Sequence, residues 1–151
     1  MIRVVIADDH ALIRDGLRRL MDDETSLSLV GEAENSGALF DLMEHQAFDV
    51  LLLDISMPDR DGLDILKDVK VRKPDIKVLM LSMHPEERYA QRALNSGASG
   101  YISKGCSSHE LVSAICTVAE GKRYLSEEYM REYFFGGREE TADTPHTRLS
   151  D

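Results

Sequence analysis

Short apolar runs alternate along the chain with segments in which apolar residues recur at helical spacing. The runs are Val4-Val5-Ile6, Leu27 to Val30, Val50 to Leu53, Val78 to Leu81 and Gly100 to Ser103. The first and third are apolar without interruption, which is typical of strands buried on both faces of a sheet. The pattern therefore predicts five strands.

Five segments with an apolar repeat near 3.6 residues follow these runs and predict amphipathic helices. They are Leu12 to Met21, Ala38 to Gln46, Leu63 to Val71, Glu86 to Asn95 and Leu111 to Ala119. Lys73-Pro74 stops the third helix, Gly97 closes the fourth and Gly121 ends the fifth. Strands and helices that alternate in this way predict an α/β fold, a doubly wound parallel sheet with helices on both faces.

The pattern changes after the last of these helices. Residues 1–122 form one predicted domain. Residues 123–137 could add one more helix, over Glu127 to Phe135, which is rich in aromatic residues. Residues 138–151 are polar and lack periodicity, which predicts a linker or a disordered tail.

The composition fits a soluble globular protein, since 42% of the 151 residues are apolar and 30% are charged. A formal net charge of −10 repels phosphate backbones and suits the binding of cations. Cys106 and Cys116 lack metal-ligand spacing, so we expect reduced thiols. No targeting segment and no run of membrane-spanning length occurs. We therefore expect a cytoplasmic protein that contacts neither nucleic acid nor membrane.

Polar side chains follow four of the predicted strands, at the point where each strand ends. Asp8 and Asp9 follow the first strand and Asp54 follows the third, while Ser82 follows the fourth and Lys104 the fifth. In such sheets ligands bind outside the carboxyl ends of the strands. We therefore expect these five side chains to lie together at one edge of the sheet.

These residue types suit phosphoryl transfer. Two carboxylates ~4 Å apart repel by about 4 kcal/mol at an effective dielectric of 20, so three of them need a cation. Mg²⁺ prefers such oxygen ligands, and the backbone carbonyl of Ser56 could add one more. Mg²⁺ and Lys104 would neutralise the phosphoryl oxygens while the Asp54 carboxylate attacks in line. Ser82 would then donate a hydrogen bond to the new phosphoryl group.

Each of these residues also has an ordinary structural interpretation. Asp8 or Asp9 could cap the helix that follows, and Asp54 could form the next turn. Lys104 could be a solvated surface lysine, and a strand-end serine such as Ser82 usually bonds to backbone. Their joint placement at successive strand ends favours the functional interpretation.

Four stretches resemble the receiver domain of response regulators of the NarL/FixJ (LuxR-type) family. They are Ile6-Ala7-Asp8-Asp9-His10, Leu53 to Pro58 with Asp61-Gly62, Leu81-Ser82-Met83-His84, and Gly97 to Tyr101 leading to Lys104. With their spacing they cover about residues 2–122. The resemblance implies a flavodoxin-like five-stranded sheet. It further implies that Asp54 is the phosphoacceptor, with Mg²⁺ held by Asp8, Asp9, Asp54 and the Ser56 carbonyl.

The same resemblance implies a two-component response regulator that receives its phosphoryl group from a sensor histidine kinase. Ser82 and Tyr101 would form the switch pair, in which Ser82 moves toward the phosphoryl group and frees space for the Tyr101 ring. The ordinary alternative for Tyr101 is a half-buried strand aromatic. Phosphorylation could also drive formation of a homodimer.

The family usually continues into a helix-turn-helix domain that binds DNA and regulates transcription. Here only Leu149-Ser150-Asp151 resembles the opening of that domain. We expect a fragment that stops before the missing output domain, with a natural stand-alone receiver as the alternative. Two departures from the family pattern are Gly105, where many receivers carry proline, and Ser82, where threonine is commoner.

Three rival functions fit these residues less well. An aspartyl phosphatase usually needs a second carboxylate two residues after its nucleophile, where this chain has Ser56. A dinucleotide-binding domain needs a glycine-rich first turn, where Asp8-Asp9 stand instead. A pseudo-receiver would lack part of the site. We therefore expect no enzyme beyond catalysis of its own phosphorylation and dephosphorylation.

Overall fold

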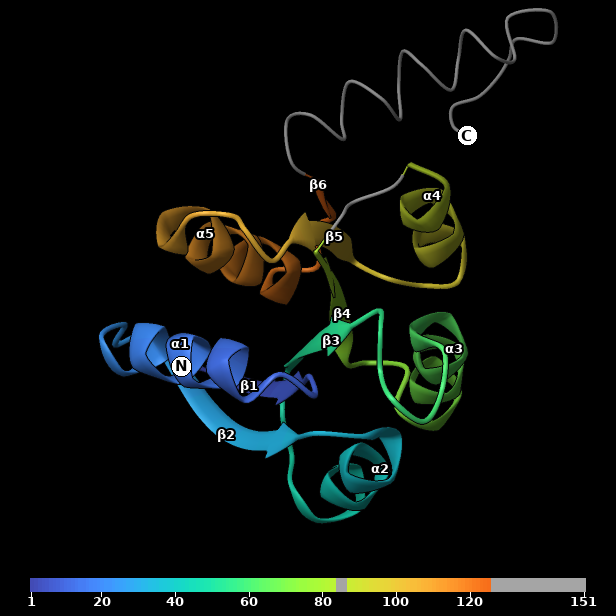
Figure 1. Cartoon of the computed structure of the whole chain (residues 1–151). Helices are drawn as coiled ribbons and strands as arrows, with labels where there is room; N and C mark the ends of the chain where they lie inside the picture. Colours follow the sequence, from blue (N-terminus) through green and yellow to red (C-terminus); the bar gives the residue numbers. More distant parts are fainter. Residues whose placement is uncertain (84–86, 126–151) are drawn as a thin grey trace, which may run out of the picture.

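The computed structural model describes residues 1–83 and 87–125, which form a parallel sheet with helices on both faces (Figure 1). The elements, in chain order, are β1 (Ile2–Ala7), α1 (Ala11–Asp22), β2 (Leu27–Ala33), α2 (Ser36–His45), β3 (Val50–Asp54), α3 (Gly62–Arg72), β4 (Lys77–Ser82), α4 (Glu87–Asn95), β5 (Gly100–Ser103), α5 (Ser108–Ala119) and β6 (Tyr124–Leu125). Each of the five predicted strands and five predicted helices has its counterpart here.

The strand order is β2-β1-β3-β4-β5-β6, and all neighbouring strands run parallel. The chain therefore moves outward from β1 to β2 on one side and from β3 to β6 on the other. The order reverses between β1 and β3, and doubly wound sheets bind their ligands outside the strand ends at this point. The predicted doubly wound sheet is confirmed.

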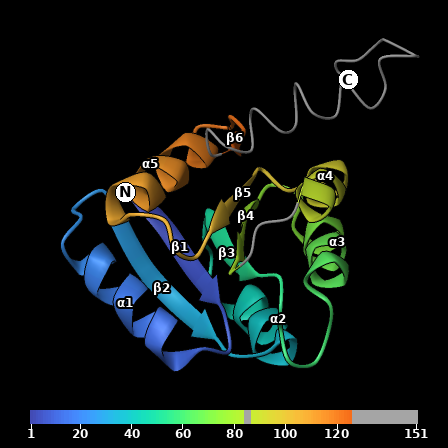
Figure 2. The ribbon, with the colours of Figure 1, turned by 45° about the horizontal axis from the view of Figure 1, so that its top comes forward.

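Two apolar clusters cover the two faces of the sheet, because successive side chains of a strand point to opposite faces. Helices α1 and α5 lie on one face, and α2, α3 and α4 lie on the other (Figure 2). In β3, Val50 and Leu52 join the cluster under α1 and α5, while Leu51 and Leu53 join the cluster under α2, α3 and α4. Burial on both faces explains why this strand is apolar without interruption.

The short strand β6 was not predicted. It pairs with β5 so closely that a Cβ atom on Gly100 would lie 2.5 Å from the carbonyl oxygen of Tyr124. The Tyr124 hydroxyl donates a hydrogen bond to Glu110 of α5, 3.1 Å away. The sheet thus continues three residues past residue 122, where the sequence predicts the end of the domain. That domain boundary stays a prediction. The helix expected over 127–135 and the tail expected over 138–151 lie outside the described residues.

Capping residues set two helix starts that the apolar repeat placed too late. Asn35 accepts a hydrogen bond from the backbone N–H of Ala38 and starts α2 at Ser36. Ser107 accepts one from Glu110 and starts α5 at Ser108. Polar first turns of this kind are invisible to a hydrophobic pattern. Among the helices that the structure describes, none has the length and apolarity that crossing a membrane requires.

Candidate functional site

Two buried aspartates and one buried lysine meet at the carboxyl end of the sheet. Asp8 directly follows β1, Asp54 ends the neighbouring strand β3, and their side chains are 0% and 1% exposed. Lys104 directly follows β5, and its side chain is 1% exposed. Its Nζ lies 2.8 Å from Asp8 Oδ2 and 3.1 Å from Asp54 Oδ2. The structure thus brings these three predicted residues together, and the alternative of a solvated Lys104 is wrong.

The hydrogen-bonding capacity of the Asp8 and Asp54 carboxylates is only partly used. Asp8 Oδ1 accepts hydrogen bonds from the backbone N–H of His10, at 2.8 Å, and lies 2.7 Å from His10 Nδ1. Asp54 Oδ1 accepts one from the backbone N–H of Ser56, at 3.0 Å. The Oδ2 atoms of both aspartates are buried and share the Lys104 ammonium, and they accept no hydrogen bond from any other described residue. Buried oxygens with free lone pairs fit a site for a hard cation.

The two aspartates differ in their affinity for a proton. Burial raises the pKa of Asp8, but the Lys104 ammonium and the hydrogen bonds from His10 outweigh it, so the pKa of Asp8 lies below its usual value. Burial also raises the pKa of Asp54, and here the neighbouring Asp8 charge adds to the effect. The Ser56 N–H and Lys104 oppose this rise without cancelling it, so the pKa of Asp54 lies above its usual value. A cation beside Asp54 would therefore favour its ionised form.

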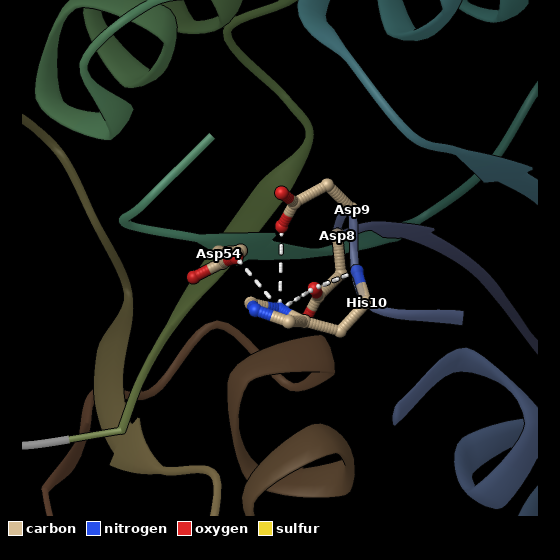
Figure 3. A group of neighbouring side chains, drawn as sticks. All are labelled: Asp8, Asp9, His10 and Asp54. Carbon is tan, nitrogen blue, oxygen red and sulfur yellow. Dashed lines mark hydrogen bonds and ion pairs between the residues drawn. The ribbon is translucent and has the colours of Figure 1, made fainter. Parts of the chain in front are cut away.

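Asp9 and His10 complete the cluster. The Asp9 side chain is 34% exposed, and its Oδ1 lies 3.2 Å from His10 Nδ1. The same ring nitrogen lies 3.7 Å from Asp54 Oδ2, so it contacts all three carboxylates (Figure 3). One ligand atom from each of the four residues lies within 4.8 Å of the others. His10 was not among the predicted site residues, and its only signal in the sequence is its place directly after two aspartates at a strand end.

The helix-cap interpretation of Asp8 and Asp9 is wrong for α1. The residue before this helix is His10, and no side chain caps it. Asp8 instead bonds to the backbone of His10, and its own carbonyl oxygen accepts a hydrogen bond from Arg14 Nη1 at 2.6 Å. These contacts fix the chain between β1 and α1 and direct the Asp8 carboxylate into the cluster.

The loop after Asp54 is held closed by its own backbone. Ser56 forms an antiparallel bridge with Asp61, and Gly62 donates a hydrogen bond to the Ile55 carbonyl at 3.1 Å. A Cβ atom on Gly62 would lie 2.6 Å from the Ile55 Cα, so only glycine permits this approach. The turn role foreseen for Asp54 is present as well, through its bond to Ser56. The loop therefore keeps the Ser56 backbone beside the Asp54 carboxylate.

A second contact, which the sequence analysis missed, ties this loop to α2. Asp59 accepts hydrogen bonds from the Ser36 backbone N–H, at 3.1 Å, and from the Ser36 hydroxyl, at 2.5 Å. These bonds lower the pKa of Asp59. No local pattern links residues 23 positions apart. The loop that follows the candidate nucleophile is thus anchored at both α2 and α3.

The predicted switch residues lie on neighbouring strands. Ser82 ends β4 beside the end of β3 and is 5% exposed. Tyr101 lies in β5, opposite Met80 of β4, and packs in the apolar cluster under α2, α3 and α4. Its side chain is fully buried, so the half-buried alternative is wrong for this conformation. A change in position of either side chain stays a prediction.

The chain resembles known proteins over most of its length. A family model described as the response regulator receiver domain matches residues 4–116. Response regulator UvrY of Escherichia coli is 35% identical over 152 aligned residues, which cover 100% of this chain and 70% of that protein. Response regulator GacA of Pseudomonas protegens is 36% identical and covers 100% of this chain and 71% of that protein.

Solved structures agree with the observed fold. A two-component response regulator of the LuxR family from Aurantimonas matches with a TM-score of 0.82 and 29% identity, over 87% of this chain and 94% of that one. The signal receiver domain of the response regulator NarL from Mycobacterium tuberculosis matches with a TM-score of 0.75 and 36% identity, over 80% and 98%. A structure of two RcsB dimers bound to two parallel DNAs matches with a TM-score of 0.80 and 28% identity, over 86% and 66%.

Proposed function

This chain belongs to the response regulator receiver domain family, and from that membership we propose that Asp54 is the residue that accepts the phosphoryl group. The chain is a receiver domain of a LuxR/NarL-type two-component response regulator. One observation supports the assignment to Asp54 most strongly. It is the only described residue that ends a strand, is buried beside a second buried carboxylate, and is ion-paired with the buried Lys104.

We propose that Asp8, Asp9 and Asp54, with the Ser56 carbonyl, hold Mg²⁺. The partly satisfied oxygens of Asp8 and Asp54 support this assignment, since an oxygen-rich donor set suits a hard cation. Bound Mg²⁺ would neutralise the carboxylates and the oxygens of the transferred phosphoryl group.

Each of these residues would then have a separate role in the phosphoryl transfer. An Asp54 carboxylate oxygen forms a bond to phosphorus while the bond from phosphorus to the donor breaks, which leaves an acyl phosphate on Asp54. The Ser56 N–H holds the second carboxylate oxygen, and the Lys104 ammonium faces the phosphoryl oxygens. Attack by water on phosphorus would reverse the modification. Ser56 stands where a phosphatase would need a second carboxylate, so this self-limited chemistry is the only catalysis we propose.

The phosphoryl donor that we propose is a phosphohistidine of a sensor histidine kinase. In the phosphorylated state the Ser82 hydroxyl would bond to the phosphoryl group and stabilise the buried position of Tyr101. We further propose that dimer formation follows, and that a helix-turn-helix domain outside residues 1–122 contacts DNA. The solved RcsB dimers on DNA support this output for the family.

Labelling with acetyl phosphate and Mg²⁺ tests the site. We expect intact-mass measurement to show one added phosphoryl group on the wild type and none on Asp54→Ala. Asp49→Ala is the matched control, because Asp49 directly precedes the strand that Asp54 ends. Equal labelling of the wild type and Asp54→Ala would show that the phosphoacceptor is another residue.

A further inference from the structure

The Nδ1 atom of the His10 ring points toward all three carboxylates of the cluster (Figure 3). Its Nδ1 is 2.7 Å from Asp8 Oδ1, 3.2 Å from Asp9 Oδ1 and 3.7 Å from Asp54 Oδ2. The Nζ of Lys104 lies 3.1 Å from the same atom. One ring nitrogen therefore contacts every charged group of the site.

Neither neutral form of the imidazole satisfies all these contacts. With a proton on Nδ1, the ring donates to Asp8 Oδ1, but the N–H then faces the Lys104 ammonium at 3.1 Å. Without that proton, Nδ1 accepts from Lys104, but its lone pair faces an Asp8 oxygen at 2.7 Å. A divalent cation among these atoms would remove the conflict, because the nitrogen and oxygen lone pairs would all face it.

The spacing of these atoms is close to that of the ligands of one metal ion. In a six-coordinate site with bonds of about 2.1 Å, neighbouring ligands lie about 3.0 Å apart and opposite ligands about 4.2 Å apart. Two of the three distances from Nδ1 to carboxylate oxygens, 3.2 and 3.7 Å, fall between these limits, and the third, 2.7 Å, lies slightly below the lower one. All four ligand atoms lie within 4.8 Å of one another, so small side-chain shifts would bring them to the spacing that one ion requires.

The backbone holds the ring in this place. His10 directly precedes α1 in an extended conformation, and its N–H is bonded to Asp8 Oδ1 at 2.8 Å. The side chain is 50% exposed, so one side of the ring stays open to water and to a phosphodonor. The nitrogen can therefore reach a bound ion without any movement of the sheet.

We propose that His10 Nδ1 is a nitrogen ligand in the metal site, so that the receiver binds divalent transition metals such as Mn²⁺ and Co²⁺ more tightly than Mg²⁺. This inference rests on the proposed metal site of the receiver. Mg²⁺ prefers oxygen ligands and keeps much of its water, whereas imidazole suits the later first-row metals. Affinities at nitrogen-containing sites rise from Mn²⁺ to Co²⁺, so the contribution of His10 should rise in the same order.

Calorimetric titration of the metal-free protein with MgCl₂, MnCl₂ and CoCl₂ tests the proposal. His10→Phe keeps a ring but removes the ligand nitrogen, and His10→Asn is a second variant in case the phenyl ring disturbs folding. We expect either substitution to weaken Co²⁺ binding by about 10- to 100-fold and Mg²⁺ binding by less than about twofold. The visible absorption of bound Co²⁺ should also shift in both variants. His109→Asn, at an exposed histidine of α5, is the matched control and should change none of these values.

Two results would overturn the proposal. Equal effects of His10→Phe and His10→Asn on Co²⁺ and Mg²⁺ would show that the nitrogen does not set metal preference. Tighter binding of all three metals in both variants would show that the ring blocks the site. Asp9→Asn separates these results from a failure of the proposed function. Loss of all metal binding in Asp9→Asn supports the carboxylate site itself, whatever His10 does, whereas unchanged binding in Asp9→Asn would contradict both proposals.

Discussion

Strand β3 lies between two aspartates whose surroundings are opposite. Asp49 precedes the strand, is 41% exposed and accepts hydrogen bonds from the Arg3 backbone N–H and guanidinium at 2.8 to 3.3 Å. These bonds lower the pKa of Asp49. Asp54 ends the strand and is 1% exposed, and burial beside Asp8 raises its pKa. One residue type thus has a stabilised charge at one end of the strand and a poorly compensated charge at the other.

The difference separates the end of the sheet where the carboxylate is stabilised from the end where we propose the chemistry. At the amino end a single arginine satisfies the carboxylate with three donors. At the carboxyl end one ammonium is shared by two buried carboxylates, and the oxygens that face it accept no hydrogen bond from any other described residue. A group that is poorly compensated in the resting protein is stabilised by whatever neutralises it, which in the proposed function is a cation and then the phosphoryl transfer.

Substitution of the positively charged side chain at each end of β3 should give the largest contrast in stability. Lys104→Met leaves two buried carboxylates unpaired and should lower the free energy of unfolding by about 3 kcal/mol in the absence of metal. Arg3→Met removes an exposed, solvent-screened partner and should cost far less. Urea unfolding followed by circular dichroism measures both values. Similar losses for the two variants would mean that burial at the carboxyl end does not matter energetically.

Added Mg²⁺ should stabilise the protein through the carboxylates at the carboxyl end of β3 and not through Asp49 at the amino end. An ion present at ten times its dissociation constant stabilises the folded state by about 1.4 kcal/mol, so millimolar Mg²⁺ should raise the melting temperature. Asp9→Asn should lose most of that rise, whereas Asp49→Asn should keep it. Calorimetric melting curves with MgCl₂ and with matched NaCl give the comparison. A rise that persists in Asp9→Asn would place the ion elsewhere.

The sequence predicted the carboxyl end of β3 better than its surroundings. The uninterrupted apolar run Val50 to Leu53 and the aspartate after it were enough to predict the strand and the position of Asp54 at its carboxyl end. The role that we propose for His10 depends on a contact between a ring and three carboxylates, which periodicity does not encode. Strand β6 escaped prediction because two residues carry no period, and its position depends on the close approach of Tyr124 to Gly100.

Neutralisation of each aspartate should change stability in opposite directions. Asp54→Asn removes a buried charge that faces Asp8, so we expect a gain on the order of 1 kcal/mol in metal-free buffer at neutral pH. Asp49→Asn removes the charged carboxylate that accepts three hydrogen bonds from Arg3. Because this pair is exposed, we expect the free energy of unfolding to fall by about 0.5 kcal/mol. Urea unfolding of both variants under the same conditions decides this. A loss of stability in Asp54→Asn would show that Lys104 already balances the buried pair.

The smallest effect concerns pH at the amino end of the strand. Because the folded-state pKa of Asp49 lies below its unfolded value of about 3.9, the Arg3–Asp49 interaction stabilises the protein above that pH and is lost as the pH falls through the folded-state pKa. The pair is exposed and screened, so the loss should amount to a few tenths of a kcal/mol, and less in high salt. The difference in unfolding free energy between the wild type and Asp49→Asn, measured from pH 6 down to the onset of acid unfolding, should shrink as the solution becomes more acidic. If that difference stays constant or grows, Arg3 does not lower the pKa of Asp49, and the contrast with Asp54 would then rest on burial alone.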